Sequence, residues 1–354
     1  MEQKQLLTNV AIIRPTLIVL LVFYHAFAPY SGAWPPIDGF PDMPVYWWLD
    51  KLSYAFMLET FVFISGYVFG YQVRMKGKSK LKVKNLLGGK FKRLMIPSMV
   101  FSFFYILLLK DITQPIGRTF YGVINGVAHM WFLPMLFWCF VMVWIIEKLH
   151  LRTRYVLALL LICSILSFVS LPLQLNHTMY YMLFFYIGYI IQRNNISIDK
   201  YYTSTYCIVL ILLFVILFPS LTLIKEYING LFFEGSWDLP SKQIITKIIH
   251  KILINLVTII YSLIGLAMLF VCVGTFEKKH HQPLPQWLIN VGNLCMGVYL
   301  FQQFILMALY KHTILPAILG PVYLPWISFV IALIGSFSLS YIFNKNKIGR
   351  LLIG

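Results

Sequence analysis

Two ionisable residues, Arg14 and His25, lie inside one strongly apolar stretch of the chain, residues 10–28. A charge within a membrane-spanning helix costs about 2.5–3.5 kcal/mol on insertion scales, so such a group usually faces a protein interior or a water-filled cavity. The eleven-residue separation corresponds to about 1100° of helix rotation, which is three turns plus about 20°. Both side chains therefore share one helix face, roughly 16 Å apart along the axis, with the cation near one membrane surface and the imidazole deeper.

Arginine and histidine in this arrangement suit the transfer of an acyl group from a thioester to a hydroxyl. Histidine titrates near neutral pH and is the usual base for removing a hydroxyl proton, which is the role predicted for His25. A phosphate-bearing donor needs a cationic site, for which Arg14 and the cluster Lys90, Lys92 and Arg93 are suited. Two simpler interpretations stay open: Arg14 could extend to the headgroups, and His25 could be a polar residue at the outer interface.

Glu59 is the one acidic residue in the interior of a predicted span. It could neutralise Arg14, orient His25, or lie at the interface. We favour the second role, as part of a catalytic pair with His25, because Glu59 is placed near the outer end of its span. Ser65 follows shortly after, and the neighbouring Gly66 favours a helix-packing role over that of a nucleophile.

The composition identifies the class of protein. Of the 354 residues, 60% are hydrophobic and only 12% are charged, and the mean hydropathy is +0.78. These values predict an all-α integral membrane protein, a single transmembrane domain over residues 1–354. The five cysteines are scattered singly and the eight histidines show no metal-ligand spacing, so no metal site is expected. Ten spans are predicted, at about 10–28, 52–73, 94–110, 129–147, 155–171, 178–192, 203–224, 252–275, 287–310 and 323–343.

The orientation follows from the segment between the second and third spans. Residues 74–93 contain nine basic residues and no acid, which predicts a cytoplasmic loop. Ten spans then place both termini in the cytoplasm. Nearly all of the formal charge of +17 falls on the cytoplasmic segments, so it reflects topology and contact with anionic lipids, and a nucleic-acid partner is unnecessary.

Several short motifs, in order along the chain, resemble the membrane acyltransferase 3 family. They are Arg14 with His25, residues 63–67 (FISGY), residues 90–97 (KFKRLMIP), residues 129–133 (HMWFL), Gly292-Asn293, and Tyr299-Leu300. The resemblance covers roughly residues 10–343. It implies transfer of an acyl group, usually acetyl, from cytoplasmic acyl-CoA to a hydroxyl of an envelope polysaccharide or lipid-linked glycan, in a bacterial cytoplasmic (inner) membrane. It also implies that the arginine and the histidine are essential.

Two positions depart from the family pattern. Pro15 follows Arg14 where many relatives have a small residue, so the helix is expected to begin or kink there. Gln302 stands where relatives often carry histidine. The predicted substrate contacts are Ser65, Trp131, Phe132 and Tyr299, although the two aromatic residues Trp131 and Phe132 could equally be packing residues.

Two other functional classes are compatible with the pattern. A transporter or flippase of a lipid-linked glycan would also have many spans and ionisable groups inside the membrane. A non-catalytic scaffold would tolerate alanine at Arg14 and His25. Loss of ester-linked acyl groups from an otherwise unchanged glycan would indicate the enzyme, whereas loss of exported polymer would indicate the flippase.

Overall fold

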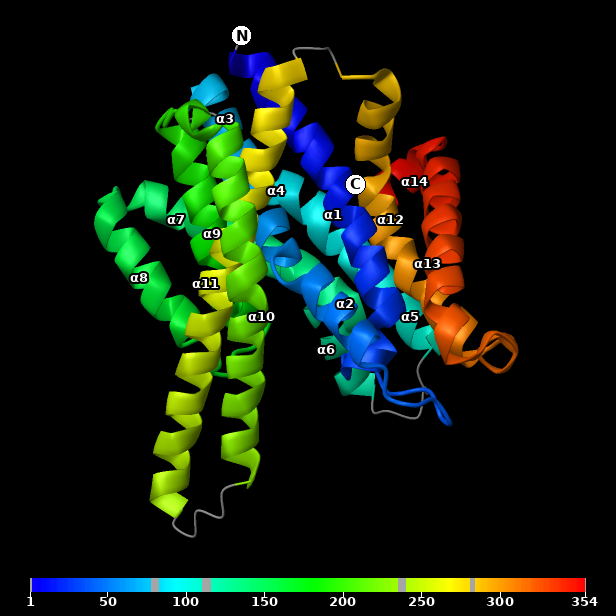
Figure 1. Ribbon diagram of the computed structural model, residues 1–354. Coiled ribbons are helices and arrows are strands. Elements are labelled where there is room, and N and C mark those ends of the chain that lie inside the picture. The colour runs from blue at the N-terminus through cyan, green and yellow to red at the C-terminus, as the bar shows by residue number, and fades with distance from the viewer. Residues whose placement is uncertain (1, 78–82, 110–115, 235–239, 281–283, 354) are drawn as a thin grey trace. The chain divides into compact units, whose positions relative to one another are not determined.

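The computed structural model describes residues 2–77, 83–109, 116–234, 240–280 and 284–353, and these ranges contain helices and no strand (Figure 1). The elements are α1 (Glu2–Ser31), α2 (Pro44–Tyr54), α3 (Met57–Lys76), α4 (Val83–Lys90), the π-helix η2 (Phe91–Met95), α5 (Ile96–Leu109), α6 (Ile116–Asn125), the 3-10 helix η3 (Ala128–Trp131), α7 (Phe132–Lys148), α8 (Thr153–Ile165), α9 (Leu175–Arg193), the 3-10 helix η4 (Asp199–Tyr201), α10 (Ser204–Glu234), α11 (Pro240–His280), α12 (Gln286–Lys311), α13 (Leu315–Asn344) and α14 (Lys347–Leu352). The predicted all-α membrane class is confirmed for the described residues.

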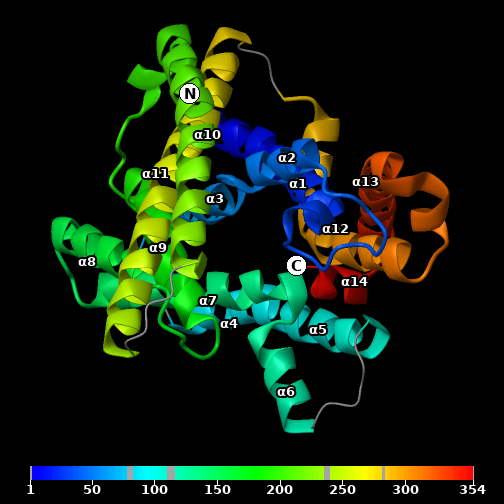
Figure 2. The same ribbon diagram turned by 60° about the horizontal axis from the view of Figure 1, so that its bottom comes forward.

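The chain divides into two compact units. The first contains Met1–Tyr54, Ser79–Val141 and Pro283–Gly354, and the second contains Ala55–Lys78 and Met142–Gln282. In the first unit, α1 packs against α2, α12 and α13, and α12 lies beside α13 in both ribbon views (Figures 1 and 2). The α12–α13 contact is close at Gly297, where an added Cβ would lie 2.2 Å from Ser340 Oγ. A larger residue at position 297 would separate the two helices.

In the second unit, α3 and α9 approach at backbone distance. A Cβ at Gly66 would lie 2.0 Å from the carbonyl oxygen of Phe185, and a Cβ at Gly70 would lie 2.3 Å from that of Tyr189. From the other side, a Cβ at Gly188 would lie 2.2 Å from the carbonyl oxygen of Phe63. Small residues four apart are the usual means of bringing membrane helices together.

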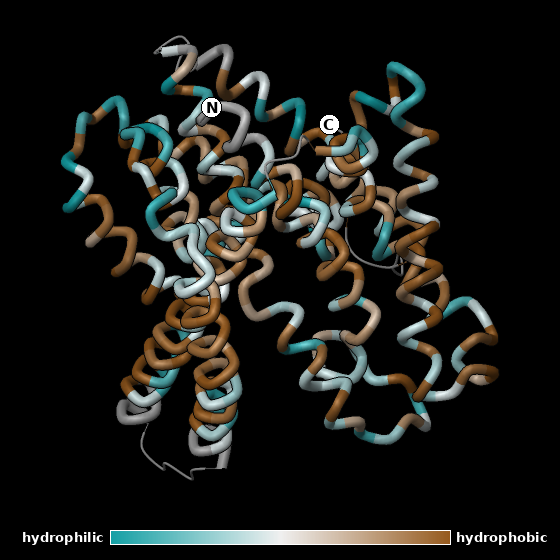
Figure 3. The backbone as a smooth tube through the Cα atoms, turned by 45° about the horizontal axis from the view of Figure 1, so that its top comes forward, coloured by the Kyte–Doolittle hydropathy of each residue, from teal (hydrophilic) through white to brown (hydrophobic). Residues whose placement is uncertain are grey.

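The other helix pair of the second unit, α10 and α11, runs side by side (Figures 1 and 2) and is hydrophobic along most of its length (Figure 3). The most apolar 18-residue stretch of α10 has a mean hydropathy of 3.0, and that of α11 has a mean hydropathy of 2.6. Only 17% of the first stretch and 39% of the second are buried. Ile208, Leu212 and Ile216 are among the exposed apolar side chains of α10. Such surfaces require a hydrocarbon environment, as expected for a membrane protein.

Among the residues that the structure describes, eight helical segments are long and apolar enough to cross a membrane, whereas ten spans are predicted from the sequence. They are Thr8–Ser31, Pro44–Met75, Leu86–Leu109, Ala128–Lys148, Ser204–Gly230, Ile245–His280, Gln286–Lys311 and Leu315–Asn344. The two remaining predicted spans correspond to α8 and α9. Helix α8 has 13 residues, about 20 Å of helix, which is shorter than a bilayer core of about 30 Å, and the number of spans stays a prediction. The cytoplasmic location of both termini stays a prediction.

Candidate functional site

His25 is held by an amide from another helix of the first unit. Its Nδ1 lies 3.1 Å from Oε1 of Gln302 on α12, and the two side chains are buried, with exposed fractions of 7% and 0%. An amide oxygen accepts hydrogen bonds, so His25 Nδ1 carries the proton and donates it. The neutral imidazole therefore has its lone pair on Nε2, as a base requires.

A second histidine, His129, lies beside His25. The two ring centroids are 6.2 Å apart. Nε2 of His129 lies 3.3 Å from the carbonyl oxygen of Leu300, which can only accept, so Nε2 carries the proton and Nδ1 keeps its lone pair. That Nδ1 and the Gln302 Nε2 are buried and have no hydrogen-bond partner among the described residues. The site therefore contains one unused acceptor and one unused donor next to the imidazole of His25.

The local fold around η3 explains how His129 is placed. Gly126 has φ +82°, and a Cβ there would lie 2.7 Å from the backbone of Met130, so the turn before His129 requires glycine. Two serines of α5 bond to the backbone of this turn: Ser102 Oγ accepts from the Val127 N–H at 3.1 Å, and Ser98 Oγ donates to the Met130 carbonyl at 3.3 Å. The turn is thus held to α5 by side chains that are themselves fully buried.

One face of α12 supplies most of the remaining contacts. Tyr299, Gln302 and Gln303 are three and four residues apart, and so lie on the same side of the helix. The hydroxyl of Tyr299 donates to the carbonyl oxygen of His129, and Oε1 of Gln303 accepts from the His129 N–H at 3.2 Å. Three side chains of α12 therefore position the two histidines.

Trp34 packs against the imidazole of His25, with 5.6 Å between ring centroids and an interplanar angle of 18°. The tryptophan contacts Tyr310 edge-on, and the Tyr310 hydroxyl donates to the carbonyl oxygen of Ala26 at 2.5 Å. Trp34 and Tyr310 thus restrict the His25 ring from the segment that follows α1 and from α12. Neither residue is singled out by the sequence motifs.

Arg14, predicted to bind the donor, is half-buried on α1 and forms no hydrogen bond or ion pair with the described residues of its unit. Arg93 of η2 is close enough to interact with it electrostatically. Two neighbouring guanidinium groups attract anions, and a planar guanidinium matches the geometry of a phosphate. Of the other predicted donor-binding residues, Lys92 is exposed, while Lys90 Nζ lies 3.7 Å from the ring centroid of Phe140.

The predicted substrate contacts of the first unit lie near His129. The ring of Phe132 is 5.9 Å from that of Tyr299 and 6.1 Å from that of Trp131. Phe132 and Tyr299 are buried, and Trp131 is half-buried. The structure therefore brings these three aromatic residues together, and their contact with a substrate stays a prediction.

Glu59 and Ser65 belong to the second unit. Oε1 of Glu59 accepts a hydrogen bond from the hydroxyl of Tyr180 at 3.2 Å, and its Oε2 is buried without a hydrogen-bond partner among the described residues. The hydroxyl of Ser65 donates to the carbonyl oxygen of Phe61 at 2.9 Å within α3, one turn earlier. The catalytic role of Glu59 and the substrate contact of Ser65 stay predictions.

Pro15 does not begin the first helix, contrary to one of the two outcomes expected from the sequence. The helix begins at Glu2 and continues through Pro15. The hydroxyl of Thr16 donates to the carbonyl oxygen of Ile12 at 3.0 Å within the same turn. Arg14 therefore lies in the interior of α1 and has helical neighbours on both sides.

Comparison with known proteins identifies the family. A family model described as an acyltransferase domain matches residues 8–345, which is essentially the whole chain. No curated protein and no solved structure matches the chain. The match includes Arg14, His25, His129 and Gln302 and gives no support to a transporter. The chain is therefore a membrane acyltransferase of the acyltransferase 3 family.

Proposed function

We propose that the protein transfers an acetyl group from acyl-CoA, most simply acetyl-CoA, to a hydroxyl group of a cell-envelope polysaccharide or lipid-linked glycan. We place it in the cytoplasmic membrane of a bacterium, as a multi-pass protein with the donor on the cytoplasmic side. The observation that carries the proposal is the buried bond between His25 Nδ1 and Gln302 Oε1, which leaves Nε2 of His25 free to act as a base. The family match supports the class of reaction.

The proton transfer follows from that tautomer. Nε2 of His25 takes the proton of the acceptor hydroxyl as its oxygen bonds to the acyl carbon, and the bond from that carbon to sulfur then breaks. The leaving thiolate takes the proton from the imidazolium, which restores His25. The unused amide N–H of Gln302 is a donor available for the negative charge that develops on the acyl oxygen.

The donor side of the proposal depends on Arg14. An unpaired guanidinium in a spanning helix is costly, and a bound phosphate would compensate for it. Arg93, a second cation, lies close to Arg14, and two neighbouring cations favour an anionic ligand such as the phosphates of a coenzyme A thioester. Lys92, exposed on the same short helix, adds positive charge for attracting that donor.

The direct test is acetyl transfer by purified protein in lipid nanodiscs. Labelled acetyl-CoA is supplied with a glycan acceptor, and ester-linked label on the glycan is measured for the wild type and for His25→Ala. Label on the glycan that disappears in His25→Ala at equal folded protein supports the proposal. Equal labelling by the two proteins would refute His25 as the base, and no labelling by the wild type with any acyl-CoA would refute the donor.

A further inference from the structure

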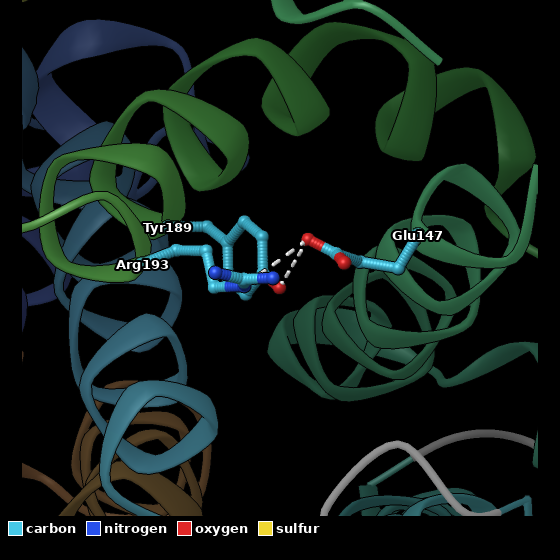
Figure 4. Close-up of polar contacts among 3 residues, drawn as sticks. All are labelled: Glu147, Tyr189 and Arg193. Atoms are coloured by element: carbon cyan, nitrogen blue, oxygen red, sulfur yellow. Dashed lines mark hydrogen bonds and ion pairs between the residues drawn. The ribbon is translucent and has the colours of Figure 1, made fainter. Parts of the chain in front are cut away.

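A polar cavity of about 210 Å³ lies in the second unit, where α7, α8 and α9 end or begin. Its charged lining residues are Glu147 at the end of α7 and Arg193 at the end of α9, with His150 in the short connection to α8. Neither the acyltransferase family match nor the proposed reaction gives these residues a role. Figure 4 shows Tyr189 and Arg193 extending from one helix towards Glu147 on another.

Glu147 and Arg193 form an ion pair through one atom of each side chain. Oε1 of Glu147 accepts a hydrogen bond from the Tyr189 hydroxyl at 2.7 Å and forms an ion pair with Nε of Arg193 at 3.5 Å (Figure 4). That Nε makes no hydrogen bond with the described residues. Arg193 also lies within hydrogen-bonding reach of the Tyr189 hydroxyl, and Oε2 of Glu147 accepts none of the hydrogen bonds found among the described residues. With side-chain exposures of 23% and 39%, both charges stay accessible from the cavity.

The cavity lies beside the end of a candidate membrane span. The candidate span formed by η3 and α7 ends at Lys148, directly after Glu147. Lys148 Nζ lies 5.2 Å from the ring centroid of Trp144, and the guanidinium of Arg154 lies 4.7 Å from that of Tyr155. Pairs of basic and aromatic side chains of this kind are typical of the membrane interface, where the ring lies at the apolar boundary and the charge reaches the phosphates.

The opposite charges of Glu147 and Arg193 favour a ligand that carries both a positive and a negative group. A lone phosphate would be attracted by Arg193 and repelled by Glu147, and a lone ammonium would experience the reverse. A headgroup with both charges satisfies both residues, and a primary ammonium can also donate hydrogen bonds to Oε2 of Glu147, which a quaternary ammonium cannot. We propose that this cavity binds the headgroup of a phospholipid with a primary amine, with its ammonium on Glu147 and its phosphate on Arg193.

The test is native mass spectrometry of the purified full-length protein titrated with phosphatidylethanolamine, phosphatidylcholine and phosphatidylglycerol. The wild type should bind the first lipid with an affinity about tenfold higher than the other two, as one well-oriented ionic hydrogen bond provides. Glu147→Gln should remove this preference while leaving phosphatidylglycerol binding intact, and Arg193→Gln should weaken the binding of all three lipids. Lys148→Gln is the matched control, since Lys148 contacts Trp144 and does not line the cavity.

Soluble phosphoethanolamine separates the headgroup from the acyl chains. It should displace the lipid, at a higher concentration because it lacks the chains that pack on the apolar helices. Where a charge variant fails to fold, Asn194→Trp fills the same cavity from an exposed position and should prevent selective binding without removing either charge. Equal affinity of the wild type for the three lipids, unchanged selectivity in Glu147→Gln, or a failure of phosphoethanolamine to compete would overturn the proposal.

Discussion

Replacing Gln302 by methionine tests whether this amide sets the tautomer of His25. Methionine has a similar length and removes the acceptor oxygen that lies 3.1 Å from Nδ1. A neutral buried hydrogen bond contributes about 0.5–1.5 kcal/mol, and at about 1.36 kcal/mol per factor of ten its loss lowers kcat by about 2- to 13-fold. The expected effect is smaller than that of removing the base, because the imidazole remains in place and still adopts the productive tautomer part of the time.

The measurement is acyl transfer per folded molecule, with kcat and KM for the donor determined separately. Gln302→Met should lower kcat and leave the donor KM unchanged, since Gln302 contacts His25 and not Arg14. Gln302→Glu keeps an acceptor oxygen for Nδ1 and loses the amide N–H proposed for the acyl oxygen, so a comparison of its kcat with that of Gln302→Met separates these two roles. Gln192→Met is the matched control, a buried amide of the second unit removed by the same change. A wild-type kcat in folded Gln302→Met would refute the idea that the amide positions the base.

Three further predictions address the base, the donor site and the orientation. His25→Ala should lose about 10²–10⁴-fold in activity per folded molecule with unchanged membrane abundance; a loss explained by abundance alone would make His25 structural. Arg14→Lys should lose most activity, chiefly through a raised donor KM, because lysine lacks the planar fork that binds phosphate bidentately, and wild-type kinetics would contradict this role. In a cysteine-free background and intact cells, Thr313→Cys should react with an impermeant thiol reagent and Ser197→Cys should not; labelling of position 197 would reverse the topology.

The sequence predicts the all-α class and most spans because long apolar runs have few alternatives to a membrane helix. The predicted span at 155–171 is longer than the helix that the structure has there. Its helix, α8, ends at Ile165, and residues 166–171 form a turn and an irregular segment despite their apolar composition. Mean hydropathy does not distinguish a helix that crosses the bilayer from a short helix followed by apolar coil, because both favour the same surroundings.

The candidate site is predictable from the sequence only along each helix. Arg14 and His25 are recognised because an ionisable group in an apolar span needs an explanation, and their spacing fixes their common face. Gln302 and Gln303 carry a weaker signal of the same kind, two adjacent amides in an apolar span, which predicts a polar contact and does not identify the partner. His129 belongs to a recognised motif, but its approach to His25 depends on the turn at Gly126 and on the serines of α5.

Two helices that are far apart in the sequence, α1 and α12, have different parts in the proposed reaction. Helix α1 supplies both the proposed base, His25, and the proposed donor-binding cation, Arg14, so their separation is fixed by helix geometry. Helix α12 supplies the Gln302 amide oxygen and the Leu300 carbonyl oxygen that set which nitrogen of each histidine carries a proton, while Gln303 and Tyr299 hold the backbone of His129. A change on α12 should therefore alter the protonation and orientation of the base without moving Arg14, whereas a change at Arg14 should alter donor binding without altering the tautomer of His25. The separate effects expected on kcat for Gln302→Met and on donor KM for Arg14→Lys follow from this division.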